Sequence, residues 1–252
     1  MLVVRNVKIR YKNSVLGFFW SLLTPICFIA IYAIFAGILG IRTSMIGGET
    51  FDFMPYLITG IIVWQYTATC FNDALHAITG NANLIKKARF PRLLLPLAMV
   101  LANAFNFLLT LLVLLVYLAC TRPVFGSLGW LPLALLTQTA LCLGLALLIA
   151  TANVFFRDTE HMTGMASMAW FFLTPVFYPV ARQIEFLAAH PVAPWLVYLN
   201  PMTGILSAYR AFFLGQAPAA GGFAISAAVA VGLLAAGLAL FQSAEGRFGD
   251  VL

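Results

Sequence analysis

The sequence predicts an all-α integral membrane protein with six transmembrane helices. Hydrophobic residues make up 63% of its 252 residues and charged residues only 9%, whereas a soluble domain carries about 25% charged residues. A chain this apolar, with a mean hydropathy of +0.99, could not cover a water-facing surface. Its long uncharged stretches are continuously apolar rather than alternating, which favours membrane helices over a barrel.

Six uncharged stretches have about the 20 residues that cross a bilayer as a helix. In chain order they are Ser21–Ile41, Met54–Phe71, Leu93–Cys120, Trp130–Phe155, Met162–Val180 and Phe223–Phe241. The last lies in a segment rich in alanine and glycine, whose small side chains let helix backbones approach closely in lipid. We therefore expect a single transmembrane domain over residues 1–252.

The distribution of basic residues places both termini on the cytoplasmic side. With the N-terminus inside, ten of the 14 Lys and Arg residues lie in cytoplasmic segments. The four left outside are Arg42, Arg122, Arg182 and Arg210. Cytoplasmic loops of membrane proteins carry an excess of Lys and Arg, so this asymmetry sets the orientation. The net charge of +6 accordingly reports topology and does not indicate a nucleic-acid partner.

Residues 1–16 predict an amphipathic helix that lies on the inner membrane surface. An apolar stripe at helical spacing is formed by Val4, Val7, Tyr11 and Val15. The basic residues of the segment are Arg5, Lys8, Arg10 and Lys12. Their stems can lie along apolar surface while their charged heads reach phosphates. The segment is either an anchor that only fixes topology or a cytoplasmic site for an anionic lipid headgroup.

Residues 80–92 form a second basic cytoplasmic segment, which carries apolar side chains at Leu84, Ile85 and Phe90. A short helix that docks into a groove on a partner protein would need such side chains, whereas a simple connection would not. The alternative is a loop that only sets topology. The third cytoplasmic segment allows only a tight turn, where Arg157 and Asp158 form a local ion pair or join the same docking surface.

Residues 182–222, on the outer side, are apolar but are interrupted by Pro191, Pro194 and Pro201. Proline removes a backbone donor and clashes with the preceding helical turn. The segment therefore predicts two short helices that dip back into the outer leaflet, with "NPMTG" near the bend. The alternative is a seventh span, which would put the C-terminus outside.

The sequence disfavours catalysis and ion coupling. It has no HExxH, no GxSxG and no metal-ligand cluster, and none of its four lysines follows a glycine as a phosphate-binding loop requires. We therefore expect no ATP hydrolysis and no metal in this chain. Ion-coupled carriers keep charges at membrane depth, where only Asp73 comes near. An intramembrane enzyme and a self-sufficient carrier are the disfavoured alternatives.

Five motifs resemble the permease subunit of type-2 ABC exporters, and most closely the branch that exports O-antigen, capsule and teichoic acid. They are "RNVKIRYKNSVLGFFWSLLTP" (Arg5–Pro25), "NANLIKKARFPRLLLP" (Asn81–Pro96), "NVFFRDTEH" (Asn153–His161), "TPVFYP" (Thr174–Pro179) and "NPMTGILSAYR" (Asn200–Arg210). The resemblance spans nearly the whole chain, and its first two motifs are specific.

The resemblance implies a homodimer paired with two copies of a separate ATPase subunit, which uses ATP and Mg while this chain holds no cofactor. It implies that the N-terminal helix and a coupling helix at Asn81–Arg92 contact that ATPase, and that Ile184–Phe213 gate the exit. The implied coupling residues are Asn83, Leu84, Ile85, Lys86, Lys87, Arg89, Phe90, Arg92, Arg157 and Asp158.

The implied cargo is a polysaccharide on an undecaprenyl pyrophosphate lipid, O-antigen first, moved across the bacterial inner membrane to its outer face. Capsule or teichoic-acid export and a drug or small-lipid exporter of the same superfamily stay open. Aromatic rings offer flat faces to sugars, and the candidates are Phe28, Tyr32, Trp64, Tyr66, Trp170, Phe172 and Tyr178. Packing or a membrane-interface position is the competing explanation for each ring.

Overall fold

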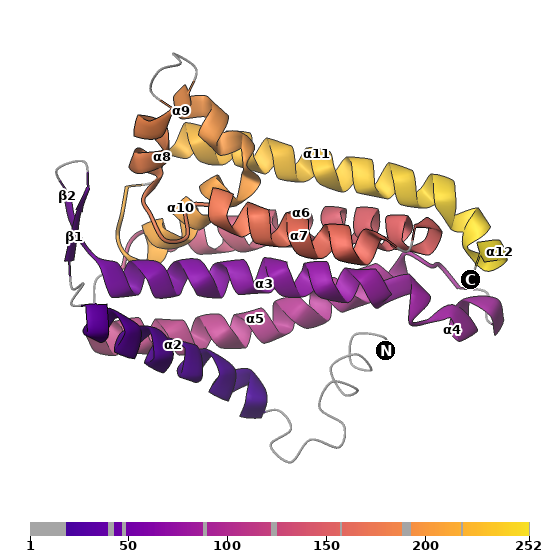
Figure 1. Cartoon of the computed structure of the whole chain (residues 1–252), viewed down its shortest axis with the longest axis horizontal. Coiled ribbons are helices and arrows are strands. Elements are labelled where there is room, and N and C mark those ends of the chain that lie inside the picture. Colours follow the sequence, from indigo (N-terminus) through magenta and orange to yellow (C-terminus); the bar gives the residue numbers. More distant parts are fainter. Residues whose placement is uncertain are drawn as a thin grey trace.

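The computed structural model describes residues 19–39, 43–46, 49–87, 90–121, 125–156, 158–187, 193–217 and 219–251. Within them the chain is a bundle of helices with one β-hairpin (Figure 1). The long elements are α2 (Phe19–Leu39), α3 (Phe53–Thr79), α5 (Leu94–Thr121), α6 (Trp130–Phe155), α7 (Thr159–Leu173) and α11 (Ala220–Ala244). They run side by side along the longest axis of the molecule.

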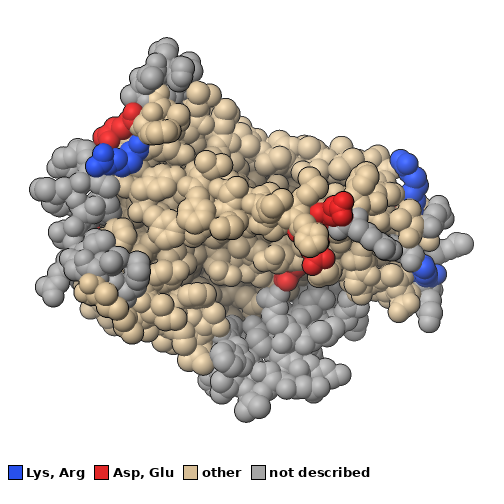
Figure 2. Space-filling model, viewed as in Figure 1, with Lys and Arg blue, Asp and Glu red and all other residues tan. Residues whose placement is uncertain are grey.

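Three helical segments of the described chain are long and apolar enough to cross a membrane. They are Leu94–Thr121, Trp130–Phe155 and Ala220–Arg247, and a shorter apolar stretch covers Leu23–Tyr32. α3 is not one of the three although it has 27 residues, because Gln65 and several Tyr and Thr residues interrupt its apolar run. On the face drawn in Figure 2, Lys and Arg lie at the two ends, and a group of Asp and Glu lies inward from the right-hand end, with an uncharged expanse across the middle.

The predicted fifth span, Met162–Val180, is not one continuous helix. α7 ends at Leu173, and the backbone of Thr174 is extended, with φ −88° and ψ 137°. The residue before a proline is disfavoured in the helical region, and Pro175 follows Thr174. At 1.5 Å per residue the 15 residues of α7 reach about 22 Å, less than the ~30 Å hydrocarbon core.

The all-α prediction also missed a β-hairpin between the first two long helices. β1 (Thr43–Ile46) pairs antiparallel with β2 (Glu49–Asp52), with Thr43 opposite Asp52. In Figure 1 the hairpin lies at the end of the bundle where α2 finishes and α3 begins. It thus marks the end opposite to α4 (Ala82–Lys87) and α12 (Phe248–Val251).

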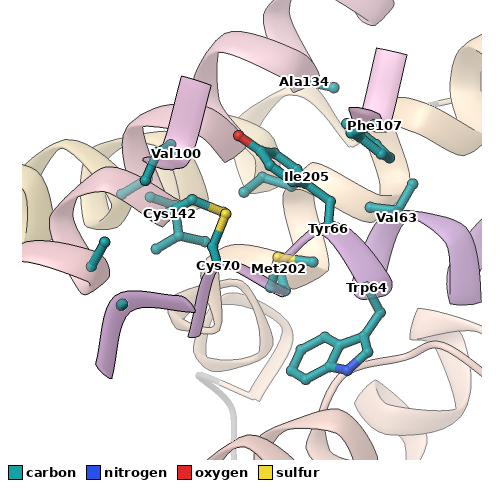
Figure 3. Packing of buried hydrophobic residues seen from close by; sticks show 14 of the residues in the cluster. Val63, Trp64, Tyr66, Cys70, Val100, Phe107, Ala134, Cys142, Met202 and Ile205 are labelled. Carbon is teal, nitrogen blue, oxygen red and sulfur yellow. The ribbon is translucent and has the colours of Figure 1, made fainter. Parts of the chain in front are cut away.

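The core lies where α6 packs against α3, α5, α10 (Pro201–Phe213) and α11. Figure 3 shows buried side chains from several of these helices meeting there. α6 and α11 approach closely at two glycines: a Cβ added to Gly237 would lie 2.5 Å from the carbonyl oxygen of Gly144. The small side chains predicted to allow close packing are therefore used at the α6–α11 contact.

The segment between α7 and α11 contains α8 (Val180–Phe186), α9 (Ala193–Leu196), the 3-10 turn η1 (Val197–Leu199) and α10. α10 begins at the predicted "NPMTG" bend: Pro201 is its first residue, and the Asn200 side chain accepts a hydrogen bond from Met202 N at 3.1 Å. Every residue of α10 except Ser207 is buried. α10 therefore belongs to the core and does not lie loosely on the bundle.

Candidate functional site

The coupling segment, which we define as residues 81–92, begins with a turn fixed to the end of α3. The Asn81 side chain donates to Ala77 O at 3.0 Å, and the Asn81 carbonyl accepts from Leu84 N at 2.9 Å. This turn reverses the chain after α3 and directs α4 across the end of the bundle. A helix is present at Ala82–Lys87, within the predicted coupling helix at 80–92.

The apolar side chains of the coupling segment turn inwards. Ile85 is only 6% exposed and belongs to the chain's own core, and Leu84 and Phe90 pack partly buried against that core. The expectation of exposed apolar side chains therefore differs from the structure, most clearly at Ile85. Asn83 and Lys86 are exposed and are the described residues of α4 that a partner can reach.

The structure describes only some of the other predicted coupling residues. Arg92 is partly buried, and Asp158 is exposed just before α7. Arg89, Arg157 and the Lys87 side chain lie outside the described residues, as do Arg5, Lys8, Arg10 and Lys12. The structure therefore places only part of the predicted coupling set, and none of the basic residues predicted to meet a lipid headgroup.

The predicted sugar-contacting aromatics do not form one surface. Trp64 and Tyr66 are buried in the core and point away from each other (Figure 3). Trp64 meets Trp170 edge-on with ring centroids 5.5 Å apart, whereas Tyr66 stacks on Phe107 at 4.6 Å. These rings fill space between helices, and their contact with a sugar stays a prediction.

The remaining predicted rings are more accessible. Phe28 and Tyr32 stack on each other along α2 with centroids 6.4 Å apart, and both are half-buried. Phe172 is 57% exposed, at the end of α7. The Tyr178 hydroxyl donates to Phe172 O at 2.9 Å, which ties the loop after α7 back onto that helix.

Arg210, on α10, is the centre of the most extensive polar arrangement in the described chain, although its side chain is only 2% exposed. Its Nη1 donates to the Tyr56 hydroxyl at 2.6 Å and to Pro175 O at 2.7 Å. Its Nη2 donates to Val176 O at 2.9 Å and to Tyr56 O at 3.4 Å. We call Arg210, Tyr56, Pro175 and Val176 the arginine node.

The arginine node joins three segments that are distant in sequence: the start of α3, the loop after α7, and α10. The guanidinium carbon lies 3.4 Å from the centroid of the Tyr56 ring, within cation–π range. The Tyr56 hydroxyl in turn donates to Tyr178 O at 3.0 Å. Among the described residues, no carboxylate pairs with Arg210, whose charge rests on neutral acceptors and one ring.

Gly60 makes room for this arrangement. A Cβ at that position would lie 2.9 Å from Arg210 Nη2 and 2.9 Å from Val176 O. A second link runs alongside it: Trp170 Nε1 donates to Asn200 Oδ1 at 2.8 Å, and Asn200 Nδ2 donates to Thr174 Oγ1 at 3.1 Å. The "TPVFYP" and "NPMTG" motifs are thus bonded to each other through side chains.

This node was not predicted from the sequence, in which Arg210 counted only as one of four outer cations. The signal was present, since an arginine in a segment expected to enter the membrane is a functional candidate by default. What the sequence lacked was an acidic partner to pair it with. The acceptors are backbone carbonyls and a phenol, which composition does not reveal.

Polar side chains within the bundle fix α3 to its neighbours. Gln138 on α6 donates to Val63 O at 2.8 Å and to Thr67 Oγ1 at 3.0 Å. Asn103 on α5 donates to Asp73 Oδ2 at 2.9 Å. Hydrogen bonds of this kind hold helices together where water is excluded. Asp73 therefore serves as an acceptor for a neighbouring helix.

Comparison with known proteins gives consistent results over most of the chain. The family described as "ABC-2 type transporter" matches residues 1–214. An "O-antigen export system permease protein RfbA" of Klebsiella pneumoniae is similar at 29% identity over 255 residues, 98% of this chain and 92% of that protein. A protein of the same name from Myxococcus xanthus is 31% identical over 251 residues, 99% of this chain and 93% of that protein.

Proposed function

Because the chain belongs to the ABC-2 type transporter family, we propose that it is the permease through which lipid-linked O-antigen polysaccharide leaves the cytoplasm. It is a multi-pass membrane permease, and in its family ATP is hydrolysed by a separate subunit. The observation that carries the choice of cargo is the near-full-length similarity to permeases named for O-antigen export. Similarity confined to one end would have supported only the family.

The topology we propose has six crossings, made by α2, α3, α5, α6, α7 with its following loop, and α11. Figure 1 supports this arrangement, since successive long helices run in opposite directions between the hairpin end and the α4 end. Lys86, Arg92 and Arg247 belong to the α4 end, which the excess of cytoplasmic Lys and Arg assigns to the cytoplasm. The hairpin, α8 and α9 then lie on the outer side.

We assign the coupling segment, together with residues 1–16, to contact with two copies of the ATPase subunit, which would bind the ATP and Mg. The exposed side chains of Asn83 and Lys86 support this assignment. Arg5, Lys8, Arg10 and Lys12 would attract the pyrophosphate of the lipid carrier at the same inner edge. Phe172, exposed beside the loop after α7, is the aromatic best placed to meet sugar.

We assign the exit gate to residues 184–213, as re-entrant helices held by the arginine node. A guanidinium with four hydrogen bonds fixes α10 to α3 and to the loop after α7. A gate held closed in this way would prevent leakage through the permease. Because α10 is buried in the core, we propose that the more exposed helices α8 and α9 move when the exit opens.

A homodimer would complete the conduit, because a single chain fills its own core with side chains. α7 supports such a contact: Met162, Met165 and Met168 are exposed along it. A Cβ added to Gly164 would meet nothing within 4 Å, which leaves room for another helix to approach closely. We therefore propose that two copies meet along α7.

Deleting the gene tests the proposed cargo. The account expects lipid-linked O-antigen polymer to accumulate on the cytoplasmic side and to disappear from the cell surface, with both effects reversed by the wild-type gene. Unchanged surface O-antigen with loss of capsule or teichoic acid would reassign the cargo. Normal levels of all three polymers with increased drug sensitivity would favour the drug-exporter alternative.

A further inference from the structure

The C-terminal helix α12 is packed into the bundle and contacts both α4 and α6. Its first residue, Phe248, is 0% exposed. The Phe248 ring meets Phe241 of α11 edge-on, with centroids 5.3 Å apart, and Phe155 of α6 at 6.0 Å. A terminal segment that is not tied down usually frays in water, but this one is anchored by a fully buried aromatic ring.

α12 also touches the coupling segment. A Cβ at Gly249 would lie 3.7 Å from Arg92 Nη2, so the backbone of α12 lies beside that guanidinium. Figure 1 shows α12 and α4 together at one end of the bundle. One short helix therefore links the coupling segment to the ends of α6 and α11.

We propose that α12 is a brace that transmits movement of the coupling segment to α11, with Phe248 as its positioning residue. This inference rests on the proposed function, because it presupposes that an ATPase moves the coupling segment. Through the 3-10 turn η2 (Glu245–Arg247), α12 continues directly from α11. A displacement of α12 therefore acts on the end of α11.

α11 reaches the opposite end of the molecule, where it holds the proposed gate. The Ser226 hydroxyl donates to Tyr198 O at 2.9 Å and accepts from Gly204 N at 3.2 Å. A Cβ on Gly222 would lie 2.4 Å from the Tyr198 ring, so ring and helix are in direct contact. The brace thus connects the coupling segment to α10 by way of a single rigid helix.

The test compares three variants of the full chain produced together with the ATPase subunit. Phe248→Ala removes the buried ring, and Phe248→Leu keeps an apolar side chain in its place. Phe105→Ala is the matched control, because that ring is 44% exposed on α5, away from both ends. The measurements are permease level in the membrane, ATPase bound per permease, ATP hydrolysis, and polymer exported per ATP hydrolysed.

We expect Phe248→Ala to retain bound ATPase and ATP hydrolysis while polymer exported per ATP falls at least tenfold. Phe248→Leu should recover most of that loss, and Phe105→Ala should match the wild type. Wild-type export per ATP in Phe248→Ala would overturn the brace, as would a loss that merely follows permease level. If the alanine variant does not accumulate, a fourth variant with a smaller apolar side chain than leucine, Phe248→Val, takes its place, and wild-type export per ATP in that variant overturns the brace. A wild-type complex that exports no polymer would instead refute the proposed function.

Discussion

Arg210 shows how one residue can hold an end of a membrane protein together. Its buried charge is balanced by three carbonyls, a phenol and an aromatic face instead of a carboxylate. A planar guanidinium can serve several acceptors at once, which an ammonium cannot. An arginine therefore suits the acceptors that the three surrounding segments present. The guanidinium and the Val176 carbonyl also fill the space beside Gly60.

We predict that Arg210→Met destabilises the protein by on the order of 3 kcal/mol, because it leaves several buried acceptors unsatisfied. Arg210→Lys should recover only part of this, since one nitrogen cannot reach every acceptor. Thermal unfolding of the purified protein measures the effect. Arg182→Met is the control: that side chain is 56% exposed and, among the described residues, pairs with the exposed Glu185, so we expect a change within about 0.5 kcal/mol. Equal effects of Arg210→Met and Arg182→Met would contradict the role of the node.

At the scale of elements, the contact between α6 and α11 depends on glycine on both sides. We predict that Gly237→Val separates the two helices, because its side chain would meet the Gly144 backbone. Overpacking of this kind costs about 1–3 kcal/mol. Gly232→Val on the same helix adds a side chain where nothing lies within 4 Å and should be tolerated. Comparable membrane levels and unfolding temperatures of the two variants would argue against the close contact.

The long helices could be predicted from the sequence because a bilayer demands uninterrupted apolar runs. α5 and α6 begin or end within a residue or so of the predicted spans. α7 was predicted too long because Pro175 and Pro179 lie in an apolar run that hydropathy cannot divide. The hairpin was missed although Gly47 and Gly48 separate its strands, a spacing typical of two-residue hairpin turns.

The candidate site was predictable only in part, because a local sequence pattern does not show what each side chain packs against. Basic and apolar residues in the coupling segment correctly indicated a short helix, but their pattern could not tell the chain's own core from a partner's groove. Ile85 lies in that core. The arginine node and the position of Phe248 depend on segments that are distant in sequence, so no local pattern specifies them.

At the scale of the whole molecule, the two ends are built from different elements. One carries α4 and α12, and the other carries the hairpin, α8 and the arginine node. Asp73, Asn103 and Gln138 link the helices between these ends. In the proposed function, the end with α4 would receive work from the ATPase and the other end would open.

Cysteine labelling of the intact cell tests the proposed orientation. In a background without native cysteines, Lys86→Cys on α4 should react only with a reagent that enters the cytoplasm, because that end carries the excess of basic residues. Glu185→Cys on α8 should react with an impermeant reagent from outside. Both positions are exposed. Labelling of both from the same side would refute the arrangement.

Reconstitution of this permease with its ATPase subunit in vesicles, with lipid-linked O-antigen polymer in the leaflet facing the ATPase, tests the central claim most directly. We expect polymer to become accessible in the opposite leaflet only when ATP, the ATPase and this chain are all present. Transfer by this chain without the ATPase, or no transfer by an intact complex that hydrolyses ATP, would contradict it.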